Sequence, residues 1–209
     1  MRKLLTCVLM MTLLLSGCKA GGGGESPEEL AGTIRDEYQN MAGWSAVAEV
    51  TADYGEKVFD FTMDVQWRRE GETVLTITAP ELLAGITARV AEKETVLEYD
   101  GVGLSLGALD GDGLTPVSAV TALMDRIGQG YMARCAWTGP EESQLAIRYQ
   151  DPELAANQGT EFLLTFDRAS HALLGAEVSS AGTTVLTVNF SNFTMEMTQD
   201  DTGDGPHMG

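Results

Sequence analysis

The stretch Phe59-Asp60-Phe61-Thr62-Met63-Asp64-Val65-Gln66-Trp67-Arg68 alternates apolar and polar residues without a break. In an extended chain, successive side chains point to opposite faces, so one face carries Phe59, Phe61, Met63, Val65 and Trp67. A strand with one apolar and one polar face is typical of an antiparallel sheet that has a core on one side and water on the other. This stretch therefore predicts a mainly β fold.

The same period of two continues on both sides of this stretch. Trp44, Ala46, Ala48 and Val50 form one face of a preceding strand, and its other face carries polar residues. Runs that alternate in the same way, separated by turns containing Gly, Pro or Asp, predict further strands at 73–79, 86–91, 95–99, 102–106, 131–138, 143–150, 161–167, 174–179 and 183–193. We expect about ten or eleven antiparallel strands in all.

Two segments change to helical spacing. Ser26 is a candidate N-cap followed by Pro27 and two carboxylates, and Leu30, Ile34, Tyr38 and Met41 then recur on one side until Gly43 ends the predicted helix. Thr115 and Pro116 begin a second helix, which Gly128 and Gly130 end. Its apolar side carries Val117, Val120, Leu123, Met124 and Ile127.

A sheet of this size must curl, and its apolar concave face needs a cover that only the two helices can supply. We therefore predict an α+β, mainly β domain over residues 26–198: a single strongly curved antiparallel sheet that forms an unclosed half-barrel lidded by helices. Apolar side chains on the concave face either line a pocket for flexible acyl chains or fill a solid core. Both readings involve Trp44, Phe59, Phe61, Met63, Trp67, Leu75, Ile77, Leu123, Met124 and Ile127.

The first 25 residues predict a membrane anchor. Arg2 and Lys3 precede an apolar run over 4–15, which is the layout of a secretory signal and is shorter than the roughly 20 apolar residues of a membrane span. Leu15-Ser16-Gly17-Cys18 looks like a bacterial lipobox. The resemblance implies that residues 1–17 are removed and that Cys18 receives a diacylglyceryl thioether; the alternative is an ordinary signal with a chance cysteine. Residues 18–25, rich in glycine, would form a tether with an r.m.s. reach of about 15 Å.

The net charge and the number of cysteines limit the partners and the thiol chemistry that we expect of this chain. The formal net charge is −18, and loss of Arg2 and Lys3 with the signal would lower it further, so nucleic acid is not an expected partner. Part of this charge lies in an acidic tail over 199–209 that we expect to be disordered. Of the three cysteines, only Cys135 would remain free, and it reads as a small buried hydrophobe more readily than as a reactive thiol.

The sequence contains few candidates for catalytic or metal-ligating residues. The two histidines, His171 and His207, lie in a predicted turn and in the tail, and neither belongs to a triad or a set of metal ligands. Asp110-Gly111-Asp112-Gly113 lacks the further oxygen ligands of a Ca²⁺ loop, so a solvated turn is preferred. We expect no cofactor, no metal and no catalytic residues. An envelope enzyme with carboxylates gathered around His171 is kept as an alternative.

The order of elements resembles the superfamily of the lipoprotein-localisation factors LolA and LolB, whose fold is a half-barrel lidded by helices. Local phrases add to the resemblance: a proline-led turn at 80–85, and Phe166-Asp167-Arg168 before a strand that begins near Leu173. The lipobox makes the chain most similar to the lipid-anchored, GerS-type members from spore-forming bacteria.

That resemblance implies a non-enzymatic lipoprotein on the outer face of the cell membrane. It would act as a binding or scaffold protein, supporting a cell-wall amidase during spore formation or germination. The alternative is a carrier, receiver or sensor of lipids or lipoproteins that uses an apolar concave pocket. The expected partners are thus the membrane, through diacylglyceryl-Cys18, and either an envelope protein or an acyl chain. Exposed edge strands also allow a homodimer.

Overall fold

The computed structural model describes residues 25–109 and 113–198. Its elements, in chain order, are α2 (Pro27–Asn40), β1 (Met41–Asp53), β2 (Val58–Arg68), β3 (Thr73–Ala79), β4 (Thr87–Ala91), β5 (Glu94–Tyr99), β6 (Val102–Gly107), α3 (Pro116–Gln129), β7 (Tyr131–Thr138), β8 (Gln144–Gln150), β9 (Thr160–Asp167), β10 (Leu173–Ser180) and β11 (Thr183–Met197). The predicted signal peptide, Cys18 and its tether, Asp110-Gly111-Asp112 and the acidic tail lie outside the described residues.

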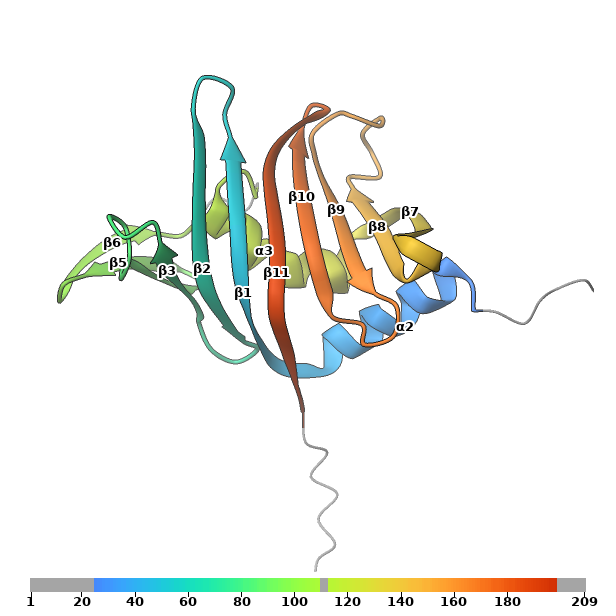
Figure 1. Ribbon diagram of the computed structural model, residues 1–209, viewed down its shortest axis with the longest axis horizontal. Coiled ribbons are helices and arrows are strands. Elements are labelled where there is room, and N and C mark those ends of the chain that lie inside the picture. The colour runs from blue at the N-terminus through green and yellow to red at the C-terminus, as the bar shows by residue number, and fades with distance from the viewer. Residues whose placement is uncertain (1–24, 110–112, 199–209) are drawn as a thin grey trace, which may run out of the picture.

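One sheet of eleven strands forms the body of the molecule, in the order β6-β5-β4-β3-β2-β1-β11-β10-β9-β8-β7 (Figure 1). Every neighbouring pair is antiparallel. The chain starts in the middle with β1, runs outward to the β6 edge, and returns from the β7 edge to β11, which pairs with β1. The two edges do not meet, so the structure confirms the predicted unclosed half-barrel.

Both helices begin where the sequence predicts. Ser26 Oγ accepts a hydrogen bond from the Glu29 amide at 3.2 Å, and Glu29 accepts one from the Ser26 amide at 2.9 Å. Thr115 and Ser118 exchange the equivalent bonds at the start of α3, at 3.2 and 3.0 Å. These reciprocal caps satisfy amides that have no partner inside the helix.

The first helix ends earlier than predicted, at Asn40, and Met41 already belongs to β1. Arg69 explains this boundary, because its guanidinium donates to the carbonyls of Tyr38 and Met41, at 3.0 and 2.7 Å. Gly43 is not a helix terminator. A Cβ at that position would lie 2.8 Å from the Trp67 carbonyl oxygen, so this glycine permits the close approach of β1 and β2.

The last strand is longer than predicted. β11 runs to Met197 because it follows β1 to its beginning, where Met41 faces Met197 and Trp44 faces Met195. Register shifts by a bulge opposite Ser45–Val47, and Asn192 has a positive φ of 53° there. That bulge breaks the simple alternation that the sequence pattern relies on.

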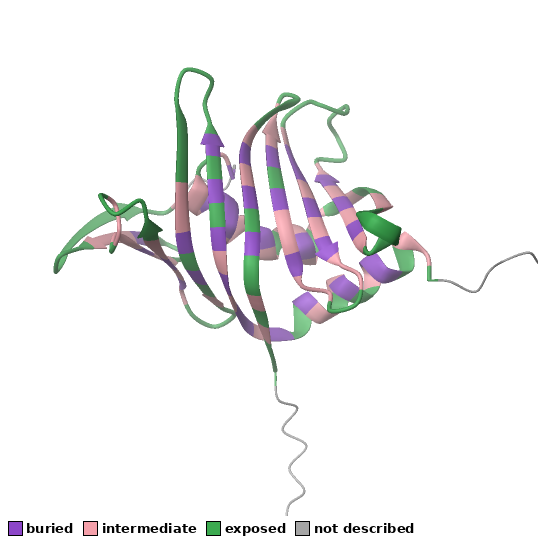
Figure 2. Ribbon diagram, viewed as in Figure 1, coloured by how far each residue is buried: buried purple, intermediate pink, exposed green. Residues whose placement is uncertain are grey.

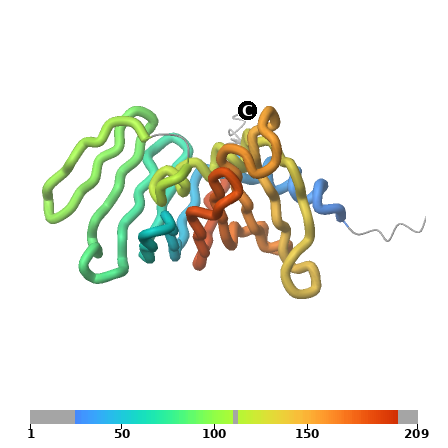
Figure 3. Tube along the Cα trace, turned by 90° about the horizontal axis from the view of Figure 1, so that it is seen from above, coloured from blue at the N-terminus to red at the C-terminus, as the bar shows by residue number. Residues whose placement is uncertain are grey.

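The core lies between the concave face of the sheet and the two helices. Residues facing inward on β1, β11, β10, β9 and β8 are buried, whereas the loops and the outer strand β6 are exposed (Figure 2). From above, β4–β6 extend to one side of the molecule (Figure 3). Helix α3 therefore covers the middle of the concave face and leaves the outermost strand β6 uncovered.

We expect the substitution Leu123→Ala to lower the free energy of unfolding by about 2–5 kcal/mol, because it removes methyl groups from a close-packed site that is 1% exposed. The neighbouring half-buried Met124 supplies the control, and Met124→Ala should cost less than about 1.5 kcal/mol. Urea unfolding of both variants measures the difference. Equal losses would show that α3 does not pack as described.

Candidate functional site

The ten apolar residues singled out from the sequence divide by burial. Trp44, Met63, Leu75, Leu123 and Ile127 are at most 2% exposed, all within one cluster. Phe61, Trp67, Ile77 and Met124 are partly buried and pack against that cluster. The structure thus brings nine of the ten together in one cluster.

Phe59 is the exception, with 46% of its surface exposed. It faces Ala52 near the tip of the β1–β2 hairpin, which extends beyond the part of the sheet that α3 covers. Its ring lies 6.3 Å from that of Tyr54. The expectation that Phe59 lines the pocket or core is therefore wrong, because alternation reports the face of a residue but not its distance from the covering helix.

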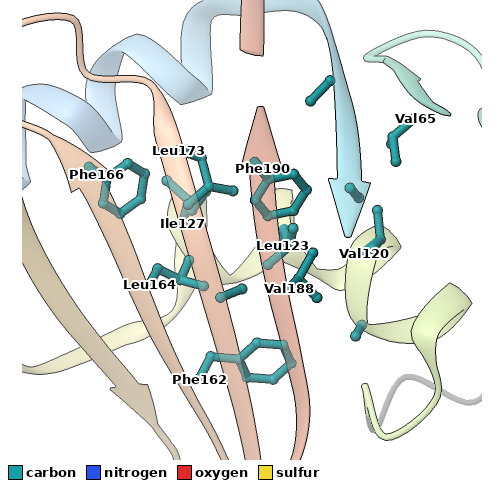
Figure 4. Packing of buried hydrophobic residues seen from close by; sticks show 14 of the residues in the cluster. Val65, Val120, Leu123, Ile127, Phe162, Leu164, Phe166, Leu173, Val188 and Phe190 are labelled. Atoms are coloured by element: carbon teal, nitrogen blue, oxygen red, sulfur yellow. The ribbon is translucent and has the colours of Figure 1, made fainter. Parts of the chain in front are cut away.

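The centre of the concave face is filled with side chains. Val120, Leu123 and Ile127 come from α3, and they meet large side chains from β9, β10 and β11 (Figure 4). The labelled residues of this layer include Phe162, Leu164, Phe166, Leu173, Val188 and Phe190. All of them are buried. Close packing of this kind gives the interior few voids larger than a water molecule.

Hydrogen bonds from α2 hold the C-terminal end of α3 in place. Arg35 donates through Nε to the Ile127 carbonyl at 2.9 Å and through Nη2 to the Gly130 carbonyl at 2.5 Å. Gln39 donates to the Gly128 carbonyl at 2.6 Å. These carbonyls belong to the last turn and the C-cap, where an α-helix has no amide donors of its own and where a cation is favoured. We call Arg35 and Gln39 the clasp.

A groove of about 630 Å³ lies between α3 and the end of β4. None of its lining residues is among the ten predicted ones. Asp125, Arg126 and Gln129 from α3 and Glu92 from the β4–β5 turn contribute to it, so it is not an apolar chamber. The sequence pattern could not reveal this groove, because it depends on where α3 crosses the sheet.

His171 pairs with a single carboxylate. Its Nδ1 lies 2.7 Å from Glu37 Oε2 on α2, and its carbonyl accepts from the Tyr38 hydroxyl at 3.0 Å. The neighbouring Ser170 hydroxyl donates to Asp167 Oδ1 at 2.8 Å, not to the imidazole. Bonds from the Ser170 amide and hydroxyl lower the pKa of Asp167. This network closes the β9–β10 turn and fixes it to α2.

Burial raises the pKa of the Cys135 thiol, which disfavours the nucleophilic thiolate. Burial likewise raises the pKa of Tyr149, which lies under the clasp near Arg35.

Within residues 25–109 and 113–198, no three His, Cys, Asp or Glu side chains are grouped so that they could hold a metal ion. No helix in this part of the chain is long and apolar enough to cross a membrane.

No family model matches the chain, and no curated protein matches it either. Similar solved structures include a LolA superfamily protein from Nitrosomonas europaea, at 9% identity and a TM-score of 0.47, covering 85% of this chain and 96% of that one. A chain in the complex of the CwlD amidase from Clostridioides difficile with the GerS lipoprotein has 14% identity and a TM-score of 0.47, covering 82% and 96%. The lipoprotein LppX from Mycobacterium tuberculosis has 14% identity and a TM-score of 0.42, covering 80% and 96%.

One of these structures is of a LolA superfamily protein, and this is the superfamily that the sequence resembles. The likeness concerns the fold.

The clasp gives a direct prediction. Arg35→Met keeps most of the aliphatic stem and removes both donors from the α3 carbonyls, so we expect the free energy of unfolding to fall by about 1–3 kcal/mol. Arg134→Met on the exposed edge strand β7 is the matched control and should change it by less than about 0.5 kcal/mol. Chemical denaturation compares the two. A loss no larger than that of the control would mean that the clasp does not hold α3.

Proposed function

We propose that this chain is a lipid-anchored envelope lipoprotein that binds a protein partner outside the cytoplasmic membrane and performs no catalysis. Residues 1–17 would be its signal peptide, Cys18 its lipidated N-terminus, and 18–25 a tether. Residues 26–198 would be the binding domain, followed by the acidic tail over 199–209. The lipobox supports the anchor, and the first described residues lie at the start of α2, on the outside of the domain (Figure 1).

The observation that carries the binding role is the filled centre of the concave face. A carrier must open and close around an acyl chain, so its lid must move. Here Leu123 and Ile127 are buried in the core, and the clasp donates three hydrogen bonds to the last turn of α3. A filled interior under a fixed helix favours a rigid body that presents its outer surfaces to a partner.

A cell-wall amidase is the partner class that we propose first, because the sequence resembles GerS-type lipoproteins. The absence of catalysis is part of the proposal and is supported by the chemistry of the described residues. His171 pairs with a carboxylate, but the hydroxyl of the neighbouring Ser170 donates to Asp167 and is not available to the imidazole. Burial raises the pKa of the Cys135 thiol and so disfavours its nucleophilic thiolate form. A support protein of this kind would act by position, which a membrane tether supplies.

The anchor is tested by Cys18→Ala. Two or three acyl chains on one residue hold a protein to a bilayer almost permanently, since each buried methylene contributes about 0.8 kcal/mol. We expect the variant to leave the membrane fraction and to lack the mass of a lipid, whereas the control Cys7→Ala stays membrane-bound. Fractionation followed by intact mass spectrometry measures both. Retention of a lipid mass in Cys18→Ala would overturn the anchor.

The binding role is tested by isolating the lipidated protein from envelopes of sporulating cells under mild conditions. We expect an amidase or another envelope protein in stoichiometric amount, and native mass spectrometry should show no acyl ligand inside the domain. Recovery of acyl species alone, weakened by Phe61→Asp, would contradict the proposal and identify a carrier. Phe61 is suited to this purpose because it is partly buried at the rim of the core.

A further inference from the structure

The outermost strand β6 is an edge without charge or cover, and its register with β5 shifts once, between Ser105 and Gly107. All six of its residues are exposed, and its sequence Val102-Gly103-Leu104-Ser105-Leu106-Gly107 contains no charge and no proline. Val102, Leu104 and Leu106 are 71%, 59% and 52% exposed. Proteins commonly blunt an edge with charges, proline, bulges or a covering element, because free backbone groups there can pair with another strand.

The apolar surface of β6 continues the core outward. Leu75 faces Ala88, Ala88 faces Leu97, and Leu97 faces Leu104, so these four residues form one row across β3–β6 on the concave face. Exposure rises along that row from 1% at Leu75 to 59% at Leu104. The row thus stops at the edge without a partner in the described chain.

The opposite edge, β7, is protected by a charge and by covering elements. Arg134 provides a charge, which β6 lacks, whereas register shifts occur on both edge strands, between Met132 and Arg134 on β7 and between Ser105 and Gly107 on β6. Helix α2 packs beside this strand, and the guanidinium of Arg168 covers the Trp137 ring at 4.0 Å. The difference between the two edges points to pairing at β6 alone.

We propose that β6 pairs with β6 of a second copy of this chain, antiparallel, about a two-fold axis at Leu104. In this register Leu104 faces the partner's Leu104, Val102 faces the partner's Leu106, and Gly103 faces the partner's Ser105. The concave side of the junction is then apolar around the Leu104 pair, and Gly103 and Ser105 put small residues on the convex side. The pairing joins two sheets and their two apolar rows into one continuous surface.

Repulsion between two strongly acidic chains does not prevent a second copy from pairing at β6. On the convex side, Arg89 pairs with Glu72 and Glu98, and Ser105 donates to Glu94 at 2.8 Å. The carboxylates of β5 would lie three strand spacings from those of the partner's β5, about 14 Å. That distance exceeds the screening length of about 8 Å at physiological ionic strength.

The attachment point of the proposed tether leaves β6 free to meet a second copy. The chain enters the domain at α2, beside β7 and β8, and β6 is at the other end of the sheet (Figure 1). Ten strand spacings separate the edges, about 48 Å along the sheet, whereas the proposed tether reaches about 15 Å. The pairing rests on the proposed function only in that anchoring places the domains side by side on one membrane.

The test uses the full lipidated protein in its native membranes, with cysteines introduced for a short bismaleimide cross-linker. Leu104→Cys should give a product of twice the protomer mass, and so should Val102→Cys co-expressed with Leu106→Cys. The control Tyr131→Cys lies on the other edge strand, is 52% exposed, and should remain at the protomer mass. Cys135 is common to all variants. The membrane-bound fraction is measured in parallel, so that a failure of anchoring is distinguished from a failure of pairing.

A second measurement does not depend on cross-linking. Leu104→Lys places two like charges face to face, so sedimentation in detergent should show half the protein mass of the unaltered chain. Leu82→Lys, at an 87% exposed position away from β6, should leave the mass unchanged. The proposal is overturned if Leu104→Cys stays at protomer mass, joins a protein of different size, or reacts no more than Tyr131→Cys. A single-protomer mass for the unaltered chain would overturn it too.

Discussion

The concave face of the sheet must be covered, and the path of the chain decides which element covers it. β6 and β7 follow each other in sequence but form opposite edges of an eleven-stranded sheet. The connection between them has to cross the whole sheet, and α3 is the helical part of that crossing. Burial of apolar surface then selects the side on which it crosses, because the large buried apolar residues of the core lie on the concave side.

The rest of the architecture follows from this crossing. α3 fills the centre with Val120, Leu123 and Ile127, and its free C-terminal carbonyls require donors, which α2 supplies through the clasp. The outermost strand β6 extends beyond the reach of α3 and keeps exposed apolar side chains. A fixed interior and an unpartnered edge are thus two consequences of one constraint, and both direct binding to the outer surfaces of the domain.

The sequence predicted what local chemistry determines. Thr115 and Pro116 marked the start of α3, and the period of two located every strand, because caps and alternation act over a few residues. Features that depend on contacts between residues far apart in the sequence were not predicted. Met41 is extended because Arg69 takes its carbonyl, β11 is lengthened past a bulge at Asn192, and Phe59 projects beyond the helix. The clasp was equally hidden, since Arg35 and its acceptors lie more than ninety residues apart in the chain.

The central claim is that α3 is a fixed part of the core and not a movable lid. Amide hydrogen exchange of the lipidated protein tests this directly, because it reports the free energy needed to open each element. The account predicts that the amides of α3 exchange as slowly as those of β1 and β11, through unfolding of the whole domain. Rapid exchange throughout α3 while β1 and β11 stay protected would show a lid that opens on its own, and it would contradict the account.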